Sequence, residues 1–160
     1  MIILEDKLYF HHTMTINYTT YDGRRGSETL NPRTHADIMT LSQGDVHPYE
    51  YSRILGIFRV KVLHTILGRK VQEVDILWVR HYQFDEKYRA GLKARRFFRV
   101  SFVRCTSEDA FGFLDPQNVL RATHLLPGFR YGCTQALLPK SLARWESEED
   151  EDWAYFHVNM

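Results

Sequence analysis

The sequence has little cysteine, no long apolar run and no catalytic signature. Two cysteines, Cys105 and Cys133, are too few for a disulfide framework, which favours a reducing, intracellular compartment. No run of roughly 18 apolar residues is present, which argues against a membrane-spanning helix, and residues 1–7 lack the pattern of a signal peptide. Serine-hydrolase, phosphate-loop and cysteine-centred signatures are also missing. We therefore predict that the chain is not an enzyme.

The chemistry of a metal site is equally sparse. The eight histidines are scattered, and no His-x-x-x-His or Cys-x-x-Cys pair supplies the spacing of structural zinc. His11 and His12 are adjacent, so their side chains would point to opposite faces of a strand. We predict no metal ligands and no cofactor. A small or degenerate enzyme is kept as an alternative, since two-metal chemistry needs only carboxylates, and those available are Asp75, Asp85, Asp109 and Asp115.

Positive charge is concentrated in one part of the chain. All 21 Lys and Arg residues lie before residue 145, together with 14 of the 20 acidic residues. Residues 87–104 hold seven basic residues and no acidic one. Such a face attracts a polyanion, although a solvated, charge-protected strand edge is the alternative. Because arginine matches phosphate well, the predicted phosphate contacts are Arg24, Arg25, Lys93, Arg95, Arg96 and Arg99.

Aromatic residues are abundant and fall in alternating segments. They make up 14% of the chain, and strands favour them. Residues 50–65 and 71–84 alternate apolar and polar side chains, as half-buried strands do, and Gly68–Lys70 is the expected hairpin turn. Asp115 before Pro116 has the pattern of a helix N-cap. Further strands are predicted at residues 12–21, 37–41, 97–103 and 153–158, and a loosely helical segment at 137–145.

These segments predict a mainly β fold: a twisted, partly closed β-barrel of six to eight strands with one or two short helices. We expect residues 1–145 to form one barrel-like domain. Residues 146–152, of which six are acidic, are expected to form an acidic connector. Residues 153–160 would be the final strand of a domain that continues beyond the sequence.

Four aromatic residues are candidates for a recognition pocket. Trp78 and Tyr82 share one face of the second long strand, and Tyr49 and Tyr51 share a face of the first. Rings gathered in this way can bind a methylated or otherwise cationic side chain. The alternative is that one set of these aromatics packs in the core.

A family resemblance runs from about residue 10 to the end of the sequence. It is carried by five motifs: Tyr18–Arg25, Leu30–Ser42, His47–Arg53, Phe111–Pro116 and Asp150–Met160. They resemble the C-terminal region of proteins encoded by basidiomycete fungal transposons, the Plavaka group of cut-and-paste transposases and their relatives. Gly23 stands where the family usually has Val, and Glu50 where it usually has an aromatic. In layout alone, Ser52–Ile57 followed by Ile76–Tyr82 is similar to the barrel of bromo-adjacent homology (BAH) domains of chromatin proteins.

The resemblance implies an accessory domain, because the catalytic carboxylates of such transposases would lie upstream. It transfers no catalytic residue to this sequence. We therefore expect a non-enzymatic, nuclear module that binds nucleic acid or chromatin, such as a nucleosome or histone tail, beside an upstream transposase domain. A protein-interaction or self-association module is the alternative.

Overall fold

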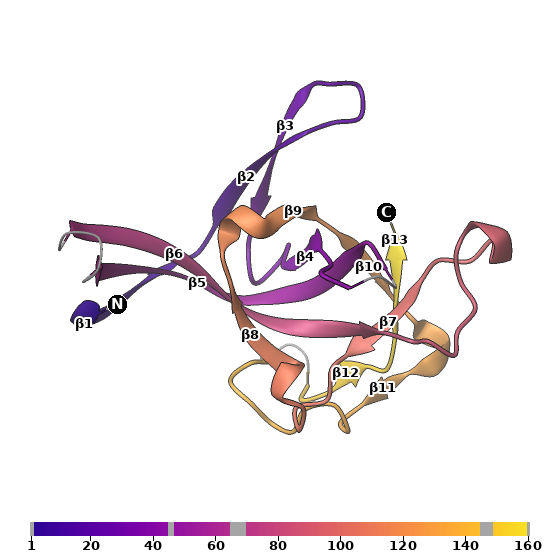
Figure 1. Cartoon of the computed structure of the whole chain (residues 1–160). Coiled ribbons are helices and arrows are strands. Elements are labelled where there is room, and N and C mark those ends of the chain that lie inside the picture. Colours follow the sequence, from indigo (N-terminus) through magenta and orange to yellow (C-terminus); the bar gives the residue numbers. More distant parts are fainter. Residues whose placement is uncertain (1, 45–46, 65–69, 145–148, 160) are drawn as a thin grey trace.

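Figure 1 shows the computed structural model, which describes residues 2–44, 47–64, 70–144 and 149–159. The chain is mainly β, as predicted. Its strands are β1 (Ile2–His11), β2 (Met14–Thr19), β3 (Arg25–Leu30), β4 (Asp37–Leu41), β5 (Tyr49–His64), β6 (Lys70–Phe84), β7 (Arg99–Phe102), β8 (Phe111–Leu114), β9 (Val119–Ala122), β10 (His124–Pro127), β11 (Cys133–Thr134), β12 (Asp152–Trp153) and β13 (Phe156–Asn159).

Helical structure in the described residues is limited to 3-10 turns of three residues each. They are η1 (Leu92–Ala94), η2 (Glu108–Ala110), η3 (Pro116–Asn118) and η4 (Phe129–Tyr131). The predicted cap is confirmed at η3, where the Asp115 carboxylate accepts a hydrogen bond from the Gln117 backbone N–H at 2.9 Å. The helical prediction for residues 137–145 is wrong over its described part. None of these turns has the length or apolar character that a membrane-spanning helix needs.

The principal sheet has nine strands. Its path runs β10-β13-β7-β6-β5-β4-β9, with β1 paired to β5 and β8 paired to β6 beside that path. The β2–β3 and β11–β12 pairs form two further sheets. The path ends at β10 and β9, so the described strands form no closed barrel.

The long antiparallel pair β5–β6 is the backbone of the sheet. Its register runs from Ser52 opposite His81 to His64 opposite Lys70, with one irregularity between Ile54 and Gly56. The predicted strands at 50–65 and 71–84 are therefore confirmed almost to the residue. The predicted turn residues Gly68 and Arg69 lie outside the described residues.

The inner halves of β5 and β6 are covered on both faces. Val79 belongs to one core cluster, with Ile38 and Ile54, whereas Tyr82 belongs to a second, with Phe102. The prediction that these strands are half-buried therefore fails for residues 77–82, because separate clusters pack against opposite faces. The outer halves extend with β1 as an arm beyond this body, seen on the left of Figure 1.

A charged cluster lies inside the body. The Asp152 carboxylate receives two hydrogen bonds from Arg80, both at 2.8 Å, and one from Arg144 at 2.7 Å. All three residues are buried, and Arg144 also donates to the backbone carbonyls of Leu138 and Asp150. The predicted acidic connector therefore does not extend to Asp152, whose charge is neutralised in the interior. Residues 146–148 of that prediction lie outside the described residues.

Candidate nucleic-acid interface

The basic loop, which we define as residues 85–98, connects β6 to β7 and projects from the sheet at the right of Figure 1. Its cations all have exposed side chains, and none forms an ion pair with another residue of the described ranges. They are Lys87, Arg89, Lys93, Arg95 and Arg96. The loop therefore exposes five positive charges that have no ion-pair partner among the described residues.

The tip of the loop has a defined backbone. The Gly91 N–H donates to the Arg96 carbonyl at 2.8 Å, and η1 lies within the turn that this bond closes. Gly91 has a φ of 95°, which glycine adopts without strain. Arg95 also has a positive φ, of 52°, at the C-cap of η1. This conformation is uncommon for a residue other than glycine.

Arg99 was predicted as a phosphate contact, and the structure gives it another position. Its guanidinium pairs with Asp85 at 2.5 Å, and both side chains are largely buried. It also lies over the rings of Tyr88, Tyr155 and Tyr131, at 4.0, 4.3 and 4.7 Å from their centroids. Burial alone would lower the pKa of Arg99, but hydrogen bonds and charge from Asp85 raise it. Arg99 therefore holds the base of the basic loop in place. We no longer count it among the phosphate contacts, because its guanidinium is largely buried and already paired.

Arg24 and Arg25 lie apart from the basic loop, at the end of the β2–β3 hairpin near the top of Figure 1. Both are exposed, and Arg24 pairs with Asp22 at 3.1 Å. The structure therefore brings Lys93, Arg95 and Arg96 together on one loop and places the two hairpin arginines elsewhere.

The four predicted pocket aromatics form no open pocket: Tyr51 and Tyr82 belong to the second core cluster, Tyr49 packs against it, and Trp78 lies outside it. Tyr51 is 2% exposed, and burial, with a smaller contribution from Tyr49, raises its pKa to about 12. The Tyr82 hydroxyl donates to Asp37 at 2.9 Å inside the second core cluster. Trp78 is half-buried and its ring lies 6.3 Å from that of Phe111. Tyr51 and Tyr82 are thus core residues, because this face of β5 and β6 is covered.

Tyr49 instead lines a cleft at the base of the basic loop, which sequence reasoning missed. The cleft has a volume of about 980 Å³ and is lined by residues from segments 42–44, 47–50, 83–90 and 98–101, together with Tyr155. Its rings include those of His47, Phe84 and Phe98, and its carboxylates are Glu50, Asp85 and Glu86. These segments are far apart in sequence, so no local pattern indicated the cleft.

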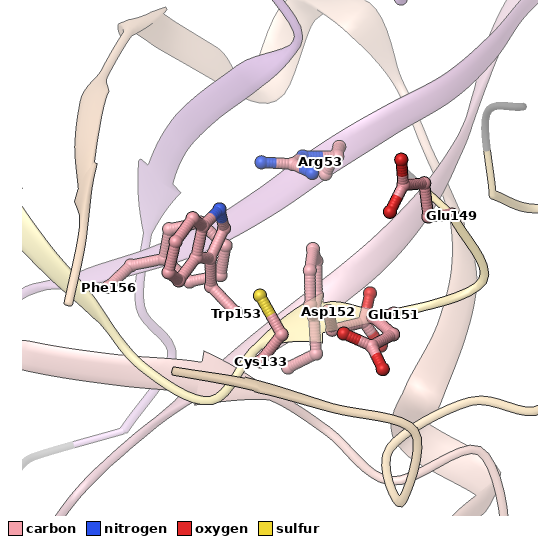
Figure 2. Close-up of a pocket in the computed structure, with 8 residues that line it drawn as sticks. Arg53, Cys133, Glu149, Glu151, Asp152, Trp153 and Phe156 are labelled. Atoms are coloured by element: carbon pink, nitrogen blue, oxygen red, sulfur yellow. The ribbon is translucent and has the colours of Figure 1, made fainter. Parts of the chain in front are cut away.

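A smaller cavity of about 260 Å³ lies beside the charged interior. Figure 2 shows Arg53 at the top, the carboxylates of Glu149 and Glu151 at the right, and the Cys133 thiol at the lower left near Trp153. Arg53 pairs with Asp37 through bonds of 2.8 and 3.2 Å. Glu149 has a positive φ of 46°, a conformation that is uncommon outside glycine. The cavity therefore contains one guanidinium, which is already paired with Asp37, and two exposed carboxylates.

Ser52 and His81 form the one contact that resembles part of a catalytic apparatus in the described ranges. Ser52 Oγ lies 2.8 Å from His81 Nδ1, a distance at which a histidine could act as base. Ser52 is, however, 1% exposed and lines none of the cavities described above. Burial lowers the pKa of His81, against smaller raising effects of Glu50 and Asp109. The pair therefore joins β5 to β6, with its serine buried.

Metal-ligating side chains do not converge in the part of the chain that the structure describes: no three His, Cys, Asp or Glu residues are grouped as ligands.

Comparisons with protein-family models, with curated proteins and with solved structures find no match to this chain.

Proposed function

We propose that this chain is a non-enzymatic module that binds the phosphate backbone of nucleic acid through the basic loop. The observation that carries the proposal is the five exposed cations on residues 87–96, held on a loop whose base is fixed by Arg99 and Asp85. Phosphate contacts of this kind provide affinity and position without reading base sequence.

The setting that we propose is chromatin in the nucleus, beside an upstream transposase domain of a fungal transposon. The motif resemblance supports this setting. The two strands that are similar to those of BAH domains, Ser52–Ile57 and Ile76–Tyr82, are paired partners here. We propose on that basis that the sheet is an open relative of the BAH barrel.

Fluorescence anisotropy with labelled duplex DNA at two salt concentrations tests the phosphate-binding function. The chain offers a matched pair of variants, since Arg95→Gln/Arg96→Gln and Arg24→Gln/Arg25→Gln each remove two adjacent exposed arginines. We expect the loop variant to reduce the slope of log affinity against log salt by about two, and the hairpin variant to leave it nearly unchanged. Equal losses in both variants, or salt-independent binding of the wild type, would contradict the proposal.

Self-association is a second candidate function, because the arm formed by β1 and the outer halves of β5 and β6 has an exposed edge strand. β1 pairs with β5 along one edge, and no other described strand pairs with it. Ile3, Leu8 and Phe10 of β1 are 49%, 63% and 51% exposed. An apolar strand with an unpaired edge is a template for a second chain, and a second copy would cover it. Light scattering that gives a monomer mass at every concentration would end this candidate.

A further inference from the structure

The cleft at the base of the basic loop has a wall of packed rings. The His47 ring lies 4.0 Å from that of Phe84 and 4.7 Å from that of Phe98, measured between centroids. Tyr49 and Tyr88 line the same cleft and are half-buried. The Arg99 guanidinium covers one face of the Tyr88 ring, so Tyr49 is the more open of the two rings. Aromatic faces of this kind accept a planar ring by stacking.

Carboxylates lie among the rings of this cleft. Glu50 and Glu86 are both exposed, and Glu50 accepts a hydrogen bond from Ser42 Oγ at 3.0 Å. Ionised carboxylates only accept hydrogen bonds. The cleft therefore suits a flat ligand that carries N–H donors on its edge.

The surrounding charge decides between a cationic side chain and a neutral planar ligand. Residues 85–99 carry six basic and two acidic side chains, so the basic loop has a net positive charge. The lining of the cleft itself holds three carboxylates, those of Glu50, Asp85 and Glu86, and two cations, Lys87 and Arg99. A lysine-rich or arginine-rich peptide would be repelled by this loop, whereas a nucleic-acid strand would be attracted to it. A nucleobase joined to that strand is neutral, has a π face and carries edge donors.

We propose that the cleft accepts an unpaired nucleobase of a strand whose phosphates lie on the basic loop. The ligand class is therefore single-stranded nucleic acid, since bases in a duplex are stacked and paired and cannot enter a cleft. This inference rests on the proposed function, because the loop must hold the backbone. The cleft volume of about 980 Å³ is within the range of sites that take small-molecule ligands.

The test measures anisotropy of the full chain with one labelled DNA oligonucleotide, as a single strand and as its duplex. The cleft variant Tyr49→Leu/Phe98→Leu removes two ring faces and keeps apolar side chains. Phe113→Leu, at a ring that is 73% exposed on β8 and outside the cleft, is the matched control. Thermal unfolding verifies that each variant is folded.

We expect the wild type to bind the single strand more tightly than the duplex. The cleft variant should weaken single-strand binding roughly tenfold and leave duplex binding and the salt slope within about twofold, as phosphate contacts are unchanged. The control should match the wild type for both probes.

Three results would overturn the inference, and they separate it from the proposed function. If the loop variant lowers the salt slope but the cleft variant leaves the single-strand preference intact, phosphate binding stands and the base site fails. If neither probe binds at low salt, both fail. If a lysine-rich peptide binds and the cleft variant abolishes that binding, the cleft is a site for a cationic side chain.

Discussion

Two groups of arginines in this protein have opposite surroundings. Arg80 and Arg144 are buried against Asp152, with side chains 3% and 1% exposed. Arg89, Arg95 and Arg96 project from the basic loop without an ion pair to any residue of the described ranges. Arg99 is intermediate in its surroundings: it lies at the base of the loop, is largely buried, and is paired with Asp85.

The difference teaches that the number of charges in a segment does not reveal what they do. A buried guanidinium must be neutralised and hydrogen-bonded, since an unpaired buried charge is strongly destabilising. An exposed one contributes little to stability and is available to a ligand. Variants at the two groups should therefore separate stability from binding.

The largest effect is expected at the buried group. Asp152→Asn removes the carboxylate that pairs with both Arg80 and Arg144, and leaves two buried cations without an acidic partner. We expect the free energy of unfolding to fall by about 3–5 kcal/mol, measured by urea denaturation. Glu151→Gln, at the exposed neighbouring residue, should change it by less than about 0.5 kcal/mol. Equal effects in the two variants would show that the interior pairs do not stabilise the fold.

An intermediate effect is expected at Arg99. Arg99→Leu loses the pair with Asp85 and the contacts with three tyrosine rings, which we expect to cost about 2 kcal/mol. Amide hydrogen exchange should accelerate in residues 86–97, because the base of the loop is released. Arg99→Lys keeps the charge but loses the stacked plane, and should fall between wild type and Arg99→Leu. Unchanged loop exchange in both variants would contradict an anchoring role.

A smaller effect is expected from pH. Burial lowers the pKa of His81 in the folded state below its unfolded value of about 6.5. The folded protein therefore binds fewer protons, and the stability from neutral His81 is fully present above about pH 6.5 and is lost as the pH falls toward the folded-state pKa. His157, whose pKa is lowered by burial and by Arg99, acts in the same direction.

Urea midpoints measured between about pH 7.5 and 5 test the pH effect. The wild-type midpoint should fall with pH, and His81→Gln should flatten that dependence. A slope that is the same in wild type and His81→Gln would assign the pH dependence to other groups.

The smallest effect on stability is expected at the exposed group. Arg95→Gln/Arg96→Gln should change the free energy of unfolding by no more than about 0.5 kcal/mol, while it weakens oligonucleotide binding in a salt-dependent manner. A loss of stability comparable to that of Arg99→Leu would mean that the loop arginines are structural after all.

The sequence predicted local structure well where the signal itself is local. The alternation along β5 and β6, the short strand β4 and the cap at Asp115 depend on neighbouring residues, and each lies where it was predicted.

Features that depend on contacts between distant segments could not be predicted. Arg99 follows Arg95 and Arg96 closely and was grouped with them. Its partners, however, are Asp85 at the other end of the same loop and Tyr155 from the C-terminal part of the chain. Tyr51 and Tyr82 were offered as pocket residues because periodicity identifies a shared face and not what covers it. The cleft needs four separate segments and had no signal in the sequence.

Amide hydrogen exchange of the whole chain, with and without a single-stranded oligonucleotide, tests the central claim most directly. We expect protection to be strongest in residues 86–97 and to extend to Tyr49 and Glu50 in the cleft. Protection confined to the β2–β3 hairpin or to the arm, with the basic loop unchanged, would contradict the claim that the exposed loop cations form the binding surface.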